Sequence, residues 1–399
     1  MAQQLVNDEG LHTSPDSHKS AFKIQKTEVI ASIPNLDLNI WYNNLLKSED
    51  VSFPRSNQLG LSPAIKAMHN LLMRNIEQNN DIGAFLIADP PALNVLPFFK
   101  RLLKSYISQR NCNSKLLLRN ESFLSSLLAL SLQIYLFVKA ETSIDFEMIL
   151  SCLNVSILDY WKQLNYFLDQ NKNIPVSLKW QLKGTDLKIL TETAWKRDSY
   201  IYKTIYKSFN SSNNRNKSSF CYLQLFGFTQ FFGRLVYHSA LRIRQVSSFI
   251  GLDDKIQEEV WAFLKFFLSE CTEYLRDKSV ETVILCCMFL AFRMRCEVRL
   301  HTLVEKYKEA TGLTVLVSSD KDEIDEINKF YSKEFCLIIK LNYYMGRENN
   351  RIKSLHPDCN LKDFLKDLKS SEGKLPIKRT REDGRLSTSR SKKIKQLSI

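Results

Sequence analysis

The stretch RDKSVETVILCCMFLAFRMRCEVRLHTLVEKYKE, residues 276–309, decides the fold of this chain. Within it, apolar side chains recur at i, i+3, i+4, i+7, i+11 and i+14 from Val280 to Met294, which is the period of an α-helix. Apolar residues also fill the other faces, as in the centre of a helical bundle or in a membrane span. The uncharged run, residues 282–292, is much shorter than the roughly 18–20 residues that cross a bilayer. We therefore expect a buried bundle helix.

Length and composition extend this interpretation to the whole chain. A chain of 399 residues with 44% apolar and 25% charged residues has a globular composition and suggests two or three domains. Glycine and proline number only 11 and 10, so turns typical of hairpins and nucleotide-binding sheets are scarce. The predicted fold class is all-α. The nine cysteines include no Cys-x-x-Cys pair and the N-terminus has no secretory pattern, which predicts reduced thiols in an intracellular protein.

The net charge of +13 is concentrated at the C-terminus, where residues 374–399 hold nine basic and two acidic side chains. This tail is polar with few large apolar residues, so we expect it to be disordered. Its basic residues form two clusters about a dozen positions apart, the spacing of a bipartite nuclear import signal. The clusters consist of Lys378, Arg379 and Arg381, and of Lys392, Lys393 and Lys395. The alternative is a solvated basic tail with loose affinity for nucleic acid.

Polar breaks divide the chain into five segments. These are an N-terminal extension that is partly disordered (1–61), a first bundle (62–209), a polar spacer (210–219), a second bundle (220–345) and the basic tail (346–399). The extension contains one amphipathic island around Trp41, which is either a docked helix or a recognition peptide. Each bundle contains one long apolar helix, at 123–138 and 280–294, so we expect two similar helical domains joined by a loop.

The order and spacing of these segments resemble the retinoblastoma pocket family. The second bundle, from LRIRQVSSFIG through DKIQEEVWAFLKFFLSECTEYLRDKSVETVILCCMFLAFRM to Phe330-Tyr331, is similar to the family's B box, with Trp261, Arg276-Asp277 and Cys286 at matching intervals. The first bundle resembles the A box through SPAIKAMHNLLM, LLLRNESFLSSLLALSLQIYLFV, DFEMILSCLNVSILDYWKQLNYFL and LTETAWKRDSYIYKTI. The resemblance covers residues 62–345 and implies two packed cyclin-like helical domains.

The resemblance implies two peptide sites. In the family, a groove on the B box takes Leu-x-Cys-x-Glu peptides, and the cleft between the boxes holds the activation segment of cell-cycle transcription factors. The groove positions of this chain are Cys286, Phe289, Arg293, Met294, Leu300, His301, Tyr331, Ser332, Cys336 and Lys340. The candidates for the cleft are Arg234 and Arg242, because arginine pairs in a bidentate manner with acidic side chains. The alternative for both arginines is a structural or surface charge.

Two groove positions depart from the family pattern. Phe289 and Ser332 stand where the family has Tyr and Asn, which removes two hydrogen-bonding groups. Arg293 and Lys340 keep positive charge for a peptide glutamate. We expect a relaxed or weakened acidic-peptide groove, and the alternative is that the groove is lost and its apolar members are core residues.

The implied function is a nuclear, non-enzymatic regulator of cell-cycle transcription that covers and represses an activation segment. Its implied partners are that segment, Leu-x-Cys-x-Glu-type peptides of corepressors, a cyclin-dependent kinase, and DNA only indirectly, with no membrane. We expect no cofactor or metal, since no histidines pair at i, i+4 and no phosphate-binding glycine loop occurs. Ser14 and Ser62, the two Ser/Thr-Pro sites, are the phosphorylation candidates. Three alternatives stay open: a cyclin-like regulatory subunit, a DNA-binding factor like a general transcription factor, and a degenerate pocket scaffold.

Overall fold

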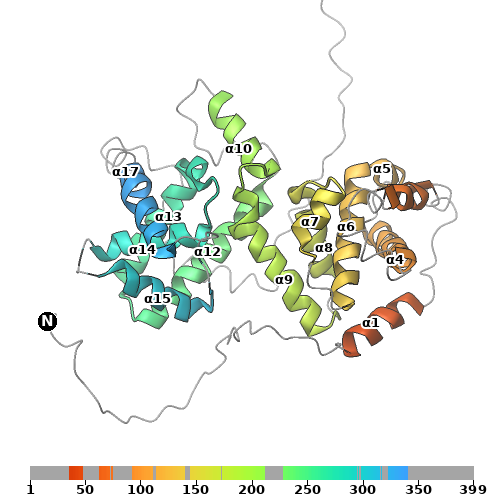
Figure 1. Cartoon of the computed structure of the whole chain (residues 1–399), viewed down its shortest axis with the longest axis horizontal. Coiled ribbons are helices and arrows are strands. Elements are labelled where there is room, and N and C mark those ends of the chain that lie inside the picture. Colours follow the sequence, from red (N-terminus) through yellow and green to blue (C-terminus); the bar gives the residue numbers. More distant parts are fainter. Residues whose placement is uncertain are drawn as a thin grey trace, which may run out of the picture. The chain divides into compact units, whose positions relative to one another are not determined.

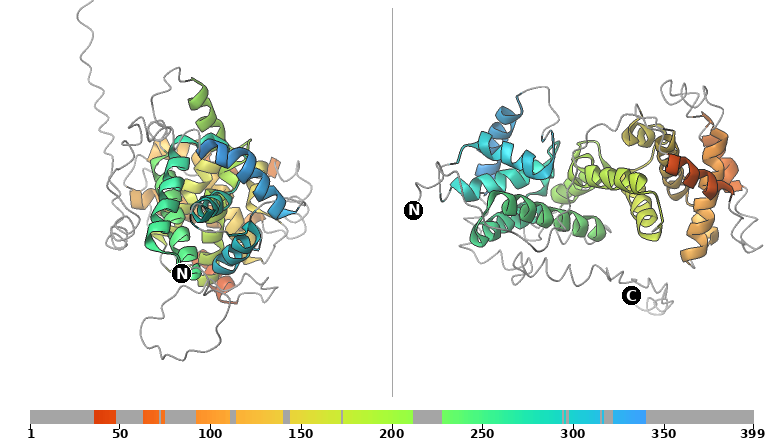
Figure 2. Two further views of the ribbon diagram at one scale, coloured as in Figure 1. Left: turned by 90° about the vertical axis from the view of Figure 1, so that its left-hand side faces the viewer. Right: turned by 90° about the horizontal axis from the view of Figure 1, so that it is seen from below.

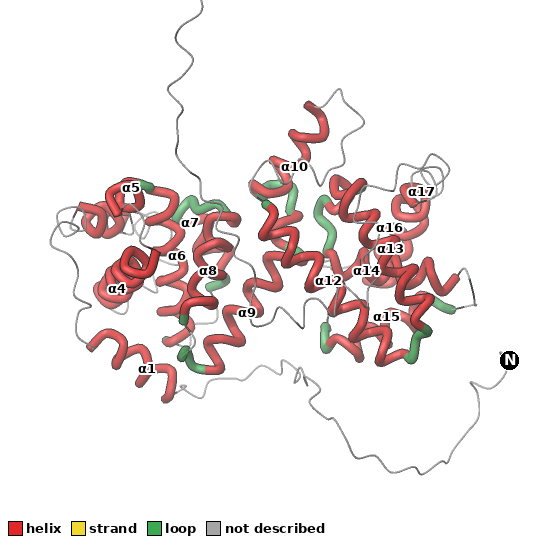
Figure 3. The backbone as a smooth tube through the Cα atoms, turned by 180° about the vertical axis from the view of Figure 1, so that it is seen from behind, coloured by secondary structure: helices red, strands yellow, loops and turns green. Residues whose placement is uncertain are grey.

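The structure of this chain is a computed structural model that describes part of the sequence. The described residues are 36–47, 63–71, 73–74, 92–110, 114–139, 144–171, 173–211, 228–293, 295, 298–314, 316 and 322–339. Every regular element in these ranges is a helix and none is a strand, which confirms the all-α prediction (Figure 3). The described ranges all belong to one compact unit.

The first bundle is built around one apolar helix, α6. Its elements are α1 (Leu36–Lys47), α4 (Ala92–Arg110), α5 (Ser114–Arg119), α6 (Glu121–Val138), α7 (Phe146–Cys152), α8 (Ile157–Gln170), α9 (Val176–Thr191), η1 (Thr193–Trp195) and α10 (Tyr200–Ser211). The side chain of Asn120 caps α6 by accepting a hydrogen bond from the Phe123 amide at 3.0 Å. Every side chain from Phe123 to Leu136 is buried, because α4, α7 and α8 cover this helix (Figure 1).

Helix α6 is long and apolar enough to cross a membrane, but most of it is buried inside the first bundle. Its apolar surface is therefore used in packing against the neighbouring helices. The predicted helix at 123–138 corresponds to α6.

The amphipathic island of the N-terminal extension is a docked helix. In α1, Leu38 and Tyr42 are buried, and the Tyr42 ring lies 5.1 Å from the ring of Phe98 and 6.1 Å from that of Tyr135. Trp41 adds an edge contact to Phe98 at 6.4 Å. These rings attach α1 to α4 and α6, which decides between the two alternatives in favour of docking.

The second bundle repeats this design around α14. Its elements are α12 (Thr229–Ile250), α13 (Asp254–Glu270), η2 (Thr272–Leu275), α14 (Val280–Arg293), α15 (Leu300–Thr311), α16 (Glu323–Phe330), η3 (Tyr331–Phe335) and α17 (Cys336–Ile338). Helices α12, α13 and α15 surround α14, and every side chain from Val280 to Phe289 is buried (Figure 1, Figure 2). The predicted helix at 280–294 corresponds to α14, which ends at Arg293.

One turn of the second bundle departs from α-helical geometry. The element η3 is a π-helix inserted between α16 and α17. Both Tyr331 and Phe335 are buried on it, and the Phe335 ring stacks on the Phe267 ring at 5.6 Å. Single π-helical turns inside α-helices are frequent at functional sites.

Candidate peptide-binding site

The first and second bundles meet through a cluster of aromatic side chains. The Trp161 ring of α8 and the Trp195 ring of η1 lie 5.2 and 6.2 Å from the Phe231 ring of α12. The Trp195 ring also lies 6.1 Å from that of Phe232, edge to face. All four side chains are buried, so this junction is a hydrophobic core shared by both bundles.

Arg234 of α12 lies at this junction and pairs with acids of the first bundle. Its guanidinium lies 3.3 Å from the Asp186 carboxylate of α9 and 3.4 Å from that of Asp169. The guanidinium also stacks 5.9 Å above the ring of Trp161, whose indole N–H donates to Asp186 at 2.7 Å. Arg234 therefore joins the two bundles, and a quarter of its side chain is left exposed.

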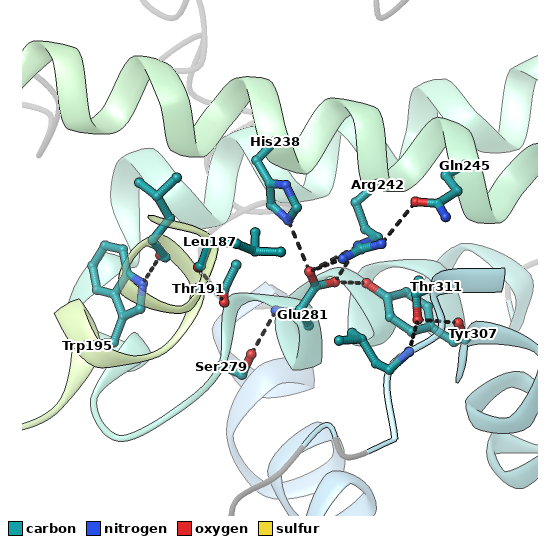
Figure 4. A network of polar contacts seen from close by, with 12 residues as sticks. Leu187, Thr191, Trp195, His238, Arg242, Gln245, Ser279, Glu281, Tyr307 and Thr311 are labelled. Carbon is teal, nitrogen blue, oxygen red and sulfur yellow. Dashed lines mark hydrogen bonds and ion pairs between the residues drawn. The ribbon is translucent and has the colours of Figure 1, made fainter. Parts of the chain in front are cut away.

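Arg242 lies eight positions after Arg234 on α12 and is buried. Its Nε donates to both carboxylate oxygens of Glu281 at 3.0 Å, and its side chain is 4% exposed (Figure 4). The prediction that Arg242 contacts a bound segment in the cleft is therefore wrong, because its charge is used inside the second bundle. This position belongs to the structural alternative.

Glu281 is the centre of a polar network that joins three helices. His238 of α12 donates to it through Nε2 at 3.1 Å, and the Tyr307 hydroxyl of α15 donates to its second oxygen (Figure 4). Burial acts to raise the pKa of Glu281, but Arg242, His238 and Tyr307 together outweigh it and lower the pKa to about 2. Gln245 extends the network by accepting from Arg242 at 2.9 Å.

Helix α9 presents an exposed stripe that ends at the junction. Trp180 is 53% exposed, although tryptophan is a large apolar side chain that is highly buried on average. Lys179 and Lys183 flank it and are exposed. Lys183 lies one turn before Asp186, which pairs with Arg234, so the stripe leads along α9 to α12. We call Lys179, Trp180 and Lys183 the α9 stripe.

The structure brings together five of the predicted groove residues of the second bundle. The Phe289 ring packs edge to face against the Tyr331 ring at 4.7 Å, and the Arg293 guanidinium lies 5.8 Å above the Phe289 ring. The pKa of the Tyr331 hydroxyl is raised, mainly by burial and secondly by the Cys336 thiol, although Arg293 acts to lower it. Cys286 is fully buried on the same helix as Phe289. These residues form a mostly buried apolar cluster with one exposed cation beside it.

The other groove candidates are placed differently. Ser332 is exposed, and its hydroxyl donates to the Asn328 carbonyl at 2.7 Å, which is an ordinary bond within a helix. Leu300 and His301 begin α15, where His301 pairs with Glu305 at 3.5 Å. Met294 and Lys340 lie outside the described residues.

Several further predictions concern residues outside the described ranges. These are the phosphorylation candidates Ser14 and Ser62, residues 212–219 of the spacer, and the import residues Lys378, Arg379, Arg381, Lys392, Lys393 and Lys395. The spacer was predicted at 210–219, but its first two residues, Asn210 and Ser211, belong to the end of α10. Within the described ranges, no three His, Cys, Asp or Glu side chains converge as a metal site. The described cysteines, Cys152, Cys271, Cys286, Cys287 and Cys336, are in the thiol form and not in disulfides.

Comparison with known families agrees with this two-bundle arrangement. The family model of the Retinoblastoma-associated protein A domain matches residues 77–205, and that of the B domain matches residues 228–340. Together the two matches cover more than half of the chain and coincide with the two bundles. The chain belongs to the retinoblastoma-type pocket proteins. Its first bundle is therefore an A box and its second bundle a B box, both of the cyclin-like helical fold.

A relative is found among characterised pocket proteins. The chain is 23% identical to Retinoblastoma-like protein 1 of Homo sapiens over 160 residues. The alignment covers 38% of this chain and 13% of the human protein, so it spans a small part of that relative. The match supports the assignment of this chain to the pocket protein family.

Sequence reasoning missed several residues of the polar network in the B box and of the junction. Glu281 had a detectable signal, because a carboxylate at the second position of an otherwise apolar helix requires a buried partner. Trp180 had a weaker one, since it lies between lysines on a helix with apolar residues on several faces. The pairing of Asp186 with Arg234 had none, because the two residues are 48 positions apart.

Proposed function

We propose that this chain is a nuclear regulator of cell-cycle transcription that holds an acidic activation segment at the junction of its A and B boxes. The observation that carries the proposal is the α9 stripe, an exposed tryptophan between two exposed lysines that leads to Arg234. Apolar anchors with a few orienting charges are what short-segment recognition requires. The positive charge of the stripe complements an acidic, aromatic-containing segment.

Isothermal titration of the full chain tests this proposal, with a peptide copied from the activation segment of a cell-cycle transcription factor. We expect micromolar or tighter binding. Trp180→Ala should weaken it about thirtyfold or more, because a buried aromatic anchor contributes about 2 kcal/mol or more. Lys183→Glu should weaken it and reduce its dependence on salt.

Two control variants replace exposed residues away from the α9 stripe. Leu116→Ala removes a 67% exposed apolar side chain of α5, and Lys329→Glu reverses an exposed charge on α16. Neither should change the affinity by more than about twofold, since isolated surface substitutions have small effects. Absence of binding to the wild-type chain would contradict the proposed function and favour the alternative of a pocket-fold scaffold.

We also propose that the B box retains a weak groove for Leu-x-Cys-x-Glu peptides of corepressors, with repression as its outcome. Phe289 and Tyr331 pack together and are buried, Cys336 is partly exposed, and Arg293 is exposed beside them to meet a peptide glutamate. The Ser332 hydroxyl is occupied within its helix, which supports a lower affinity than an amide at this position would give.

Nuclear localisation and phosphorylation stay predictions from the sequence. Replacing Lys392, Lys393 and Lys395 by alanine in a fluorescently tagged full chain should move it from the nucleus to the cytoplasm. Unchanged nuclear accumulation would contradict the import signal. A cyclin-dependent kinase partner is expected to act at Ser14 or Ser62, which mass spectrometry of the purified chain can detect.

A further inference from the structure

Asp277, in the loop before α14, has an unusual backbone conformation. Its φ is +55°, a left-handed value that residues other than Gly, Asn and Asp rarely adopt. The conformation directs its amide toward the A box, where the N–H donates to the Trp195 carbonyl at 2.9 Å. Its carboxylate accepts from the Arg197 amide at 2.8 Å. One hydrogen bond is therefore donated by the B box to the A box, and the other is donated by the A box to the B box.

Further contacts of both boxes surround this pair of bonds. On the A-box side, the ring of Trp195 is buried against α12 and its indole N–H donates to the Leu190 carbonyl at 2.8 Å. On the B-box side, the carbonyl of Glu273 in η2 accepts from the Tyr202 hydroxyl of α10 at 3.2 Å. The two boxes are thus joined at a second place nearby, between α10 and η2.

The demands on residue 277 are specific. Alanine would strain the left-handed backbone, and glycine would relax it but would leave the Arg197 amide without its acceptor. Asparagine meets both demands, because it tolerates this conformation and its side-chain oxygen accepts hydrogen bonds. The negative charge matters less, because the side chains of Asp277 and Arg197 are 49% and 64% exposed and exposed ion pairs contribute little.

We propose that Asp277 is a positioning residue that clasps the B box to the A box and thereby sets the geometry of their junction. The clasp combines a backbone conformation, which also closes the turn from Leu275 to Lys278 within the B box, with one side-chain acceptor that bonds to the A box. This inference goes beyond the proposed function, since it concerns how the boxes are held and does not depend on any peptide.

Hydrogen–deuterium exchange of the full chain tests the clasp in four forms: wild type, Asp277→Asn, Asp277→Gly and Asp277→Ala. The readout is deuterium uptake in fragments that cover residues 195–199 and 276–279. Asp277→Asn should exchange like wild type. Asp277→Gly should exchange about tenfold faster or more in both fragments, because a charge-assisted bond to a backbone amide is lost. Asp277→Ala should exchange faster still.

A second left-handed residue provides the matched control. Asn154, in the turn after α7, has a φ of +50° and lies in the A box. Asn154→Gly should leave exchange in residues 195–199 unchanged. If Asp277→Ala fails to fold, the comparison of the Asn and Gly variants decides the question. Equal exchange in Asp277→Gly and wild type, or accelerated exchange in Asp277→Asn, would overturn the proposal.

Discussion

At the scale of single residues, Glu281 explains how a charge is kept inside an apolar helix. Its carboxylate receives hydrogen bonds from Arg242, His238 and Tyr307, which belong to α12 and α15, two of the helices packed against α14. A buried charge without such partners is strongly unfavourable. Removing one member of the pair therefore leaves the other charge uncompensated.

Glu281→Gln is expected to lower the free energy of unfolding by about 3–5 kcal/mol, because the Arg242 guanidinium is then buried without a counter-ion. Urea unfolding at pH 7 measures the effect. Glu305→Gln on the exposed face of α15 is the control, with an expected change within about 0.5 kcal/mol. Equal losses in the two variants would contradict the buried pair.

The same pair predicts how stability depends on pH. The pKa of Glu281 is lowered from 4.5 to about 2 in the folded chain. A carboxylate with a lowered pKa stabilises the fold fully above its unfolded pKa, and this contribution is lost as the pH falls through the folded pKa. The stability difference between wild type and Glu281→Gln should be constant at neutral pH and shrink between about pH 4.5 and 2. Denaturant unfolding over this range measures it, and a constant difference would be inconsistent with the assignment.

At the scale of elements, α12 contains two glycines with opposite roles. Gly251 ends the helix with a φ of +75°, and its N–H donates to the Ser247 carbonyl. Gly233 lies inside the helix, and a Cβ added there would have nothing within 4 Å. Backbone conformation alone therefore distinguishes the two positions.

The same substitution should consequently have opposite effects at these glycines. Gly251→Ala is expected to destabilise the chain by about 1–2 kcal/mol, because alanine is strained in the left-handed conformation. Gly233→Ala should stabilise it by about 0.5–1 kcal/mol, because alanine favours helix interiors. Thermal unfolding of the two variants side by side checks the signs, and a shift in the same direction for both would refute this account of α12.

The B groove is a second feature of element scale, formed by α14 and η3. Adding the missing polar groups with Phe289→Tyr and Ser332→Asn together should tighten binding of a Leu-x-Cys-x-Glu peptide about five- to 150-fold, since each group can form one further hydrogen bond. Fluorescence anisotropy with a labelled peptide measures the affinity, and a peptide with its glutamate replaced by glutamine tests the role of Arg293. Unchanged affinity in the double variant would mean that these positions do not face a peptide.

Helices that are buried on all faces could be predicted from the sequence, but a local change in helical geometry could not. The helices now seen as α6 and α14 were predicted because long runs of apolar residues fill their faces, and the uncharged run in α14 is too short to cross a membrane. The π-helix η3 left no signal, because hydrophobic periodicity does not separate one wider turn from the α-helix around it. The docking of α1 was one of two open alternatives.

At the scale of the whole molecule, the order of the two boxes was predictable and the contacts between them were not. Arg234 and Arg242 were equal candidates in the sequence, eight positions apart on one helix. The structure separates them, because one meets Asp186 of the A box and the other meets Glu281 of the B box. Such pairings depend on residues 48 and 39 positions away, which a single sequence does not connect.

The junction that these contacts form is the centre of the proposed function. Hydrogen–deuterium exchange of the full chain, with and without a saturating acidic activation peptide, tests it most directly. The account predicts that the peptide slows exchange in residues 176–187 of α9 and 229–241 of α12, while α14 is unchanged. Slower exchange confined to residues 286–293 and 331–336, or no change at saturation, would contradict binding at the junction of the two boxes.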